Sequence, residues 1–324
     1  MNSRKLLIMV ILLALAAGGI FLTFKTTGKS HKTTVAIFNL MSHPILDASA
    51  TGVKEGLAAA GYGSDQLNIV EVNANGEMDK LNAFAIELLA AHPDVIVPIS
   101  TPVTQAVFKE ASKSQHIVFS TVTNPNDVGM NQNPSNMTGV CDSVNYESNF
   151  DLIFELFPNV KTIGIIYNAG ESNSQYGVLQ IQSLAKRRGI ELKLVTVSQT
   201  QEVADAARSL IGSVDVFYVG SDNTVVAAMA ALTKVAYEKN VPVLASDLGS
   251  VQEGALAAVS VDYTKLGRRA GALAAQVLKT GELPKDHSPV MFLGDQLVLN
   301  EKAAKQLHYD FPVAVRDRAN DIVR

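Results

Sequence analysis

Residues 216–226, V-F-Y-V-G-S-D-N-T-V-V, predict the architecture of the whole chain. The first four are β-branched or aromatic, and such a short apolar run is typical of a buried strand. A polar turn begins at Gly220, and apolar residues at helical spacing continue to residue 237. Strand, polar turn and helix make half of a parallel βαβ unit. Ligands bind beyond the carboxyl ends of such strands. The alternative is that the serine or aspartate of this turn only caps the helix, and this turn alone does not favour either role.

The same pattern recurs on both sides of this stretch. Predicted strands at 34–38, 94–99 and 117–119 alternate with helices and end in small polar residues, which indicates a doubly wound α/β domain. The pattern restarts after residue 145, with strands at 162–167 and 241–245 among others. We therefore expect two Rossmann-like lobes of the same kind.

The last part of the chain contains more elements than the second sheet needs. A helix at 265–279 and a strand at 290–299 follow the strand at 256–261. We expect the chain to cross back and give this helix to the first lobe. The predicted N-terminal lobe is 34–141 plus 262–288, and the C-terminal lobe is 142–261 plus 289–324. Several crossings would make a multi-strand hinge and a clamshell.

The composition limits the possible functions. Of 324 residues, 47% are apolar and 18% charged, which supports a large folded core. The net charge of −4 argues against nucleic acid or an anionic membrane surface as the main partner. The single cysteine, Cys141, is expected to be a buried small residue, and it excludes an intrachain disulfide. There is no CxxC or HExxH motif, so neither a metal nor a cofactor is expected.

The amino-terminal residues 1–33 are predicted to be a signal-anchor and linker. Arg4 and Lys5 precede an uncharged run at 6–24, which is just long enough to span a bilayer as a helix. We expect an uncleaved anchor. A signal cleaved near the A-L-A at 14–16 is the alternative, and a buried core helix is a third. With an anchor or a cleaved signal, the rest of the chain is exported to the periplasm or the outer face of the cytoplasmic membrane.

Small polar residues follow six predicted strands and would line one cleft if the lobes face each other. Hydroxyls and helix N-termini suit a carboxylate, whereas acidic side chains suit an ammonium group. A zwitterion such as an amino acid fits this combination. A sugar site usually also contains aromatic side chains that stack on the ligand. The chain has no Trp, although Tyr167 and Tyr263 are candidates for the wall of the cleft. The groups are Ser42, Ser100 with Thr101, Thr123 with Asn124, residues 172–174, residues 221–224, and Ser246 with Asp247.

An enzymatic function has little support in the sequence. There is no G-x-S-x-G elbow, no G-x-G-x-x-G after the first strand and no P-loop. His43 stands at a strand end without a nucleophile beside it and is expected to be a solvated loop residue. An enzyme using His43 or Glu171 as a base is kept as a third hypothesis. A membrane-anchored ligand sensor built on the same domain is the second.

Several segments, in this order and at this spacing, resemble the TrpX-like family of ABC transporter substrate-binding proteins. The resemblance covers residues 34–312. It implies a type I periplasmic-binding-protein fold and partnership with permease and ATPase subunits. The segments include H-P-I-L-D-A (43–48), S-T-P-V-T-Q-A (100–106), V-F-S-T-V-T-N-P (118–125), P-N-V-K-T-I-G-I-I-Y-N (158–168), S-D-N-T-V-V (221–226) and A-S-D-L-G-S-V-Q-E-G-A-L-A-A-V-S-V-D-Y-T-K-L-G (245–267).

The resemblance also implies a set of ligand-binding residues. Ser100, Thr101 and Thr123 would bind a carboxylate, and Asp222 or Asp247 an ammonium group. Many members have Asp where this chain has Asn124, which could change the preferred ligand charge. The leading hypothesis is therefore a monomeric, non-enzymatic receptor for an amino acid, with aromatic ones among the candidates. The full set is Ser42, Ser100, Thr101, Thr123, Asn124, Asn173, Ser174, Asp222, Asn223, Thr224, Asp247 and Ser250.

Overall fold

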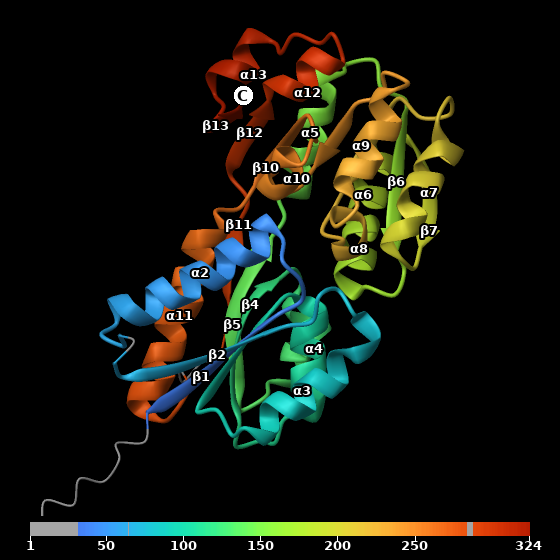
Figure 1. The fold of residues 1–324 in the computed structure, drawn as a ribbon. Coiled ribbons are helices and arrows are strands. Elements are labelled where there is room, and N and C mark those ends of the chain that lie inside the picture. Colours follow the sequence, from blue (N-terminus) through green and yellow to red (C-terminus); the bar gives the residue numbers. More distant parts are fainter. Residues whose placement is uncertain (1–31, 64, 284–287) are drawn as a thin grey trace, which may run out of the picture. The chain divides into compact units, whose positions relative to one another are not determined.

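The computed structural model describes residues 32–63, 65–283 and 288–324 (Figure 1). The predicted signal-anchor, except for the last residues of its linker, lies outside this part. Residues Thr33–Arg324 form one compact unit, and the description below concerns that unit. None of its described helices is long and apolar enough to cross a membrane.

The first sheet has six strands in the order β11-β5-β4-β3-β1-β2, all parallel. Helices α2 and α11 cover one face, and α3 and α4 cover the other (Figure 1). The strands are β1 (Thr33–Asn39), β2 (Leu67–Asn73), β3 (Val95–Ile99), β4 (His116–Val122), β5 (Met137–Ser143) and β11 (Val290–Leu293), and the helices are α2 (Pro44–Ala59), α3 (Leu81–Ala90), α4 (Thr101–Glu110) and α11 (Tyr263–Thr280).

The second sheet has seven strands in the order β13-β12-β10-β9-β8-β6-β7. Only the β10–β12 pair is antiparallel. Its strands are β6 (Thr162–Asn168), β7 (Glu191–Val197), β8 (Val216–Val219), β9 (Val243–Ala245), β10 (Ala257–Ser260), β12 (Gln296–Asn300) and β13 (Asp321–Val323). The associated helices are α5 (Tyr146–Leu156), α6 (Ser172–Arg188), α7 (Val203–Leu210), α8 (Asn223–Val226), α9 (Met229–Tyr237), α10 (Leu248–Gln252), α12 (Glu301–Gln306) and α13 (Val313–Asp317).

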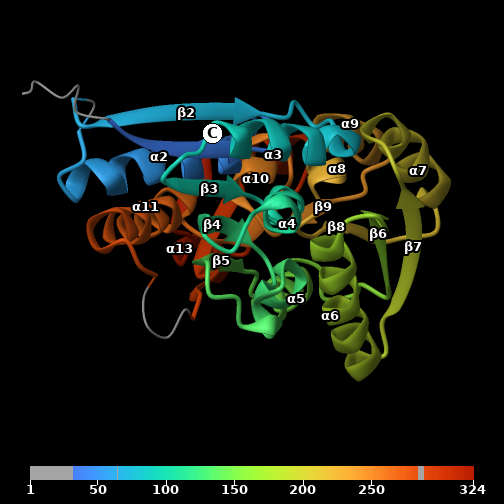
Figure 2. The ribbon, with the colours of Figure 1, turned by 90° about the horizontal axis from the view of Figure 1, so that it is seen from below.

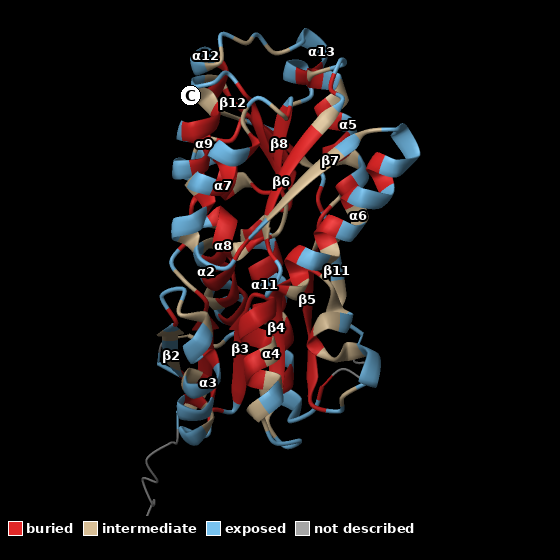
Figure 3. Cartoon of the chain, turned by 90° about the vertical axis from the view of Figure 1, so that its right-hand side faces the viewer, coloured by how far each residue is buried: buried red, intermediate tan, exposed pale blue. Residues whose placement is uncertain are grey.

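The central strands of both sheets are buried along their length, as expected for parallel sheets covered on both faces (Figure 3). Residues that follow the carboxyl ends of strands in both sheets line one cavity. Figure 2 shows the two sheets from below. The predicted α/β architecture with two sheets is confirmed. Short 3₁₀ turns occur at Met78–Lys80, Pro125–Val128, Met130–Gln132 and Thr200–Glu202.

Two predicted elements are interrupted in the structure. The expected strand at 290–299 is two strands, because β11 pairs with β5 in the first sheet and β12 pairs with β10 in the second. The break falls at Gly294 and Asp295. The expected helix at 225–237 is divided into α8 and α9. The run at 225–237 contains no Gly or Pro to mark its break, whereas Gly294 and Asp295 do mark the break between β11 and β12 in the sequence.

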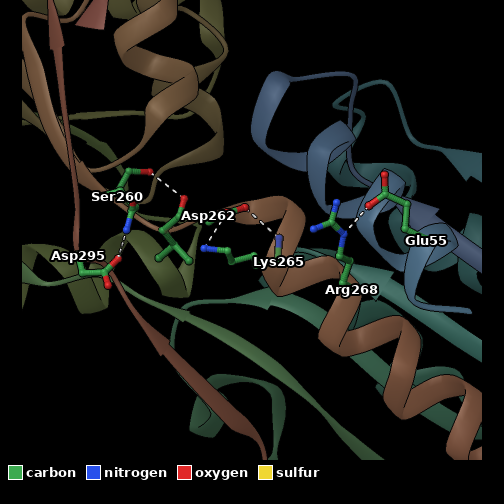
Figure 4. Close-up of polar contacts among 8 residues, drawn as sticks. Glu55, Ser260, Asp262, Lys265, Arg268 and Asp295 are labelled. Carbon is green, nitrogen blue, oxygen red and sulfur yellow. Dashed lines mark hydrogen bonds and ion pairs between the residues drawn. The ribbon is translucent and has the colours of Figure 1, made fainter. Parts of the chain in front are cut away.

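The chain crosses between the sheets three times, after β5, β10 and β11. The crossings are hydrogen-bonded to one another: Gly294 N–H donates to the Ser143 carbonyl (3.0 Å), and Asp295 N–H donates to the Ser260 carbonyl (3.1 Å; Figure 4). Because β5 ends at Ser143 and β11 begins at Val290, the boundaries predicted at 141/142 and 288/289 precede these crossings. We propose lobe boundaries near 143, 261 and 294.

Candidate functional site

One cavity is lined by residues that follow the carboxyl ends of strands in both sheets. The first sheet contributes the loop after β1 and the ends of β3, β4 and β5. The second sheet contributes the start of α6 and the turns after β8 and β9. The lining residues are Met41, His43, Ile45, Leu46, Ser100, Thr101, Thr121, Thr123, Asp142, Asn173, Ser221, Asp222, Asn223, Val226, Ser246, Asp247 and Tyr263.

Ser100 joins β3 to α4 at the wall of this cavity. Its backbone has φ 95° and ψ 157°, a conformation that non-glycine residues rarely adopt and that concentrates at functional sites. Its side chain does not cap α4, and its buried Oγ has no hydrogen-bond partner within residues 32–63, 65–283 and 288–324. The first amide groups of a ten-residue helix and a free hydroxyl suit an anionic group.

The end of β4 is distorted in the same way. Thr121 has φ 58°, and the register between β4 and β5 shifts between Phe119 and Val122. Thr121 Oγ1 donates to Ser49 Oγ (3.0 Å), and the Thr123 N–H donates to Thr101 Oγ1 (3.4 Å). These contacts tie the ends of β3 and β4 to each other and to α2. The Thr101 hydroxyl is therefore held by the backbone and the Thr121 hydroxyl by a side chain of α2.

Asp142, near the end of β5, is a buried carboxylate on the cavity wall. It is 3% exposed, and burial raises its pKa to about 7. Oδ2 accepts a hydrogen bond from the Tyr263 hydroxyl (3.2 Å), whereas Oδ1 has no partner in the described part of the chain. Because a buried carboxylate oxygen without a partner costs free energy, Asp142 is suited to receive a donor from a bound molecule.

Asp222 lines the cavity, but its carboxylate is already engaged. Oδ1 accepts from Val225 N–H (2.8 Å), and Oδ2 accepts from Asn168 N–H (2.6 Å) and Ser174 Oγ (2.5 Å). Burial and the nearby Glu171 carboxylate raise the pKa of Asp222 to about 7. The predicted ammonium-binding role of Asp222 remains a prediction, and these three hydrogen bonds favour a role in holding the turn.

Asp247 is engaged in a similar way at the start of α10. Oδ1 accepts from Ser250 N–H (2.7 Å), and Oδ2 accepts from Ser250 Oγ (2.6 Å). Asp247 is buried and faces the cavity, while Ser250 does not line it. The predicted ligand role of Ser250 thus stays a prediction, and its contacts explain how Asp247 is oriented.

Glu171 is only 1% exposed, and its carboxylate holds the turn after β8 by hydrogen bonds. Its Oε1 accepts from Thr224 N–H (3.0 Å) and Thr224 Oγ1 (2.7 Å). Its Oε2 accepts from Asn223 N–H (3.0 Å), Asn223 Nδ2 (2.6 Å) and Asn173 Nδ2 (3.0 Å). Both carboxylate oxygens are saturated, so the structure favours a positioning role for Glu171 over the basic role considered from the sequence.

Replacing Glu171 with alanine should lower the free energy of unfolding by about 3 kcal/mol, because several buried donors would lose their acceptor. Chemical denaturation measures this loss. Glu147→Ala is the matched control, since Glu147 makes only an exposed ion pair with Arg187 (3.0 Å) and should cost less than about 1 kcal/mol. Equal losses in the two variants would show that Glu171 does not hold the turn.

The structure brings part of the predicted site set to the cavity and leaves the rest outside its walls. Ser42 is exposed and donates to Asp47 (2.8 Å), and Asn124 is bound to Asp127 (2.9 Å). The predicted residues that line the cavity are Ser100, Thr101, Thr123, Asn173, Asp222, Asn223 and Asp247, and those that do not are Ser42, Asn124, Ser174, Thr224 and Ser250.

Other wall residues were not in the predicted set. The expectation that His43 is solvated is wrong: it is 7% exposed and faces the cavity. Asp142 stands beside Ser143 at the end of a strand. This is the pattern that identified the other polar groups, so the sequence could have indicated Asp142 as a site residue. The apolar wall residues Met41, Ile45, Leu46 and Val226 carry no such signal. Thr121 was not expected either, whereas Ser221 and Ser246 belong to the polar groups expected in the cleft and Tyr263 was a candidate wall.

Comparisons with known proteins agree on one family. The model of the ABC transporter substrate-binding protein family matches residues 34–323. The chain is 36% identical over 289 residues to a protein of Clostridioides difficile (strain R20291) named tyrosine-binding protein, covering 87% of this chain and 83% of that one.

Two solved structures are similar over most of the chain. A conserved domain protein from Vibrio cholerae has a TM-score of 0.86 and 32% identity, with 90% of this chain and 99% of that one covered. An ABC domain from Streptococcus pneumonia, in complex with L-Trp, has a TM-score of 0.84 and 29% identity. The match covers 90% of this chain and 100% of that one.

Proposed function

Because the chain belongs to the family of ABC transporter substrate-binding proteins, we propose that it binds an amino acid in the cavity between its two sheets and delivers it to an ABC permease. The names of the tyrosine-binding relative and of the L-Trp complex support an aromatic amino acid as the ligand. Family membership also supports the prediction that the protein is not an enzyme.

The main support is that two buried polar atoms of the cavity, one able to donate and one that accepts, have no hydrogen-bond partner in the described part of the chain. Ser100 Oγ, beside the start of α4, can donate to a carboxylate, and Asp142 Oδ1 can accept from an ammonium group. Buried polar groups are nearly always paired, so these atoms are suited to a bound zwitterion. Met41, Leu46 and Val226 offer apolar contact to its side chain.

Closure of the two lobes would accompany binding. The cavity draws its walls from both sheets, so a ligand contacts all of them only when the lobes are together. Gln105 of α4 donates to Ser172 Oγ of α6 (2.9 Å), which links the two sides next to the cavity. A ligand that contacts both sides shifts the population toward the closed form.

The location of the protein follows from the same proposal. A receptor for an ABC importer works outside the cytoplasm. The apolar run at 6–24 would anchor it beside the permease and ATPase, and the protein would act as a monomer. The mass of the mature amino terminus tests the anchor, because a cleaved signal would remove this run.

Isothermal titration calorimetry of the full chain in mild detergent tests the proposed ligand class. We expect L-tyrosine or L-tryptophan to bind as one molecule per chain. N-acetyl-L-tyrosine lacks the ammonium charge and tyramine lacks the carboxylate, so each should bind at least roughly 30-fold more weakly. Failure of every L-amino acid to bind, or equal binding of tyramine and L-tyrosine, would contradict the proposal.

A further inference from the structure

His43 is a buried imidazole that the zwitterion-binding groups do not use. It lies in the loop between β1 and α2, where it precedes the helix without capping it. Only 7% of it is exposed, and it faces the cavity. Neither Nδ1 nor Nε2 has a hydrogen-bond partner among the residues that the structure describes. A neutral imidazole has one donor and one acceptor nitrogen, so both functions are available to a ligand.

The second sheet holds this ring in place. Gly249, in α10, packs directly against it: a Cβ atom at Gly249 would lie 2.8 Å from His43 Cε1 and 3.1 Å from Ile45 Cγ2. A side chain at Gly249 would press on the ring, which would have to shift to make room. His43 lies in the loop after β1 of the first sheet and Gly249 in α10 beside the second sheet, so the imidazole is confined when the two sides are together.

Counting the unpaired polar atoms of the cavity indicates what His43 contacts. Ser100 Oγ and Asp142 Oδ1 are assigned to the carboxylate and ammonium of the ligand. Among the residues that the structure describes, the other buried wall atoms without a hydrogen-bond partner are the two nitrogens of His43 and Asn173 Oδ1. Met41, Ile45, Leu46 and Val226 line the same cavity. The cavity thus combines apolar residues with polar atoms that the two charged groups of the ligand would leave unpaired.

We propose that His43 is a specificity-determining residue that hydrogen-bonds a polar group on the ligand side chain. The preferred ligand is then an amino acid with a largely apolar side chain and one polar group, and the phenol hydroxyl of tyrosine fits best because it both donates and accepts. The inference rests on the proposed function and narrows its ligand class. A cavity that pairs with such a hydroxyl disfavours the analogue that lacks it, because its own polar atoms would stay unpaired.

Calorimetry on the full chain with matched ligands tests this inference. L-Tyrosine should bind at least roughly 10- to 100-fold more tightly than L-phenylalanine, which differs only by the hydroxyl. 4-Methoxy-L-phenylalanine can accept but not donate, and its affinity should fall below that of tyrosine. Equal affinities for tyrosine and phenylalanine would overturn the role of His43 while leaving the amino-acid receptor intact. Failure to bind any amino acid would overturn both.

Two variants separate a specificity role from a structural one. His43→Leu should lower the affinity for tyrosine to that for phenylalanine, and the affinity for phenylalanine should change by less than about threefold. His92→Asn is the control, because His92 is exposed in the loop before β3, away from the cavity. Equal losses for both ligands in His43→Leu would mean that His43 acts on the common part of the ligand or on closure. If His43→Leu does not fold, the role of His43 is tested with His43→Asn and with the ligand series on the natural protein.

Discussion

Replacing Asp142 with asparagine should weaken amino-acid binding by about 2–5 kcal/mol, which is roughly 30- to 5,000-fold in Kd. The ammonium group of the ligand would lose its charge partner in a buried site. Folding should not suffer, because the variant removes a buried carboxylate whose Oδ1 has no partner in the described chain. An asparagine carbonyl can still accept the hydrogen bond from Tyr263. Calorimetry measures the affinity, and thermal unfolding of the ligand-free protein is the control.

The two carboxylates can be distinguished with the same measurements. Asp222→Asn should mainly reduce stability, because Asp222 accepts from Asn168, Ser174 and Val225 within the protein. Asp142→Asn should mainly reduce affinity. Normal affinity in Asp142→Asn would refute its assignment as the ammonium partner and would return that role to Asp222 or Asp247.

Asp142 should also make binding depend on pH. Burial and the nearby Asp247 carboxylate raise its pKa to about 7, although the Tyr263 and Thr123 hydroxyls act in the opposite direction. A bound ammonium group would lower this pKa, so the protein must release a proton to bind the ligand below pH 7. Affinity should be constant above about pH 7 and fall by up to about tenfold per pH unit below it.

The same shift has an opposite effect on the ligand-free protein. A carboxyl with a raised pKa holds its proton longer in the folded than in the unfolded state, so its contribution to stability is lost as pH rises from about 4 to about 7. Asp142→Asn should remove the contribution of Asp142 to the pH dependence of affinity and to the pH dependence of stability. Asp222, whose pKa is also raised to about 7, would account for any slope that stays. An unchanged binding profile in Asp142→Asn would contradict the assignment.

Substituting the glycines between α2 and α11 should cause a large loss of stability. The backbones of these helices touch: a Cβ at Gly271 would lie 2.1 Å from the Val53 carbonyl oxygen, and one at Gly52 would lie 2.3 Å from that of Thr264. Gly56 and Gly267 are equally close to the facing backbone. No side-chain rotation can relieve contacts with backbone atoms, so the helices would have to separate.

We expect Gly271→Ala to lower the free energy of unfolding by about 3 kcal/mol and Tm by about 6–12 °C. Arg268→Gln is the matched control on the same helix pair. Arg268 makes only an exposed ion pair with Glu55 (2.6 Å; Figure 4) and should contribute less than about 1 kcal/mol. A Gly271→Ala protein as stable as Arg268→Gln would show that the two helices can move apart freely.

This helix pair also supports the site. His43 directly precedes α2, and Tyr263 begins α11, so both cavity residues depend on how the two helices are held. Gly271 itself lies far along α11 from the cavity. Loss of affinity in Gly271→Ala would therefore arise through displacement of these helix ends and not through direct contact.

The sequence by itself determined the architecture and the family. Alternating strand and helix patterns predicted two α/β sheets, and the structure confirmed them. The type I periplasmic-binding-protein fold and the substrate-binding family were confirmed by the matches over most of the chain. Ser100, Thr101 and Asn173 line the cavity, and their role in binding a ligand stays a prediction. Local pattern suffices here, because the carboxyl ends of parallel strands meet at one edge of a sheet.

Only the tertiary structure decided which polar groups remain available to a ligand. Asp222 follows β8 and Asp142 lies near the end of β5, yet Asp222 is paired with Asn168 and Ser174, 54 and 48 residues away along the chain, while Asp142 has an oxygen without a partner among the described residues. His43 is buried, and Gly249 of α10, on the side of the second sheet, packs against its ring. Hydrogen-bond partners and burial come from residues distant in sequence, so no local pattern reports them.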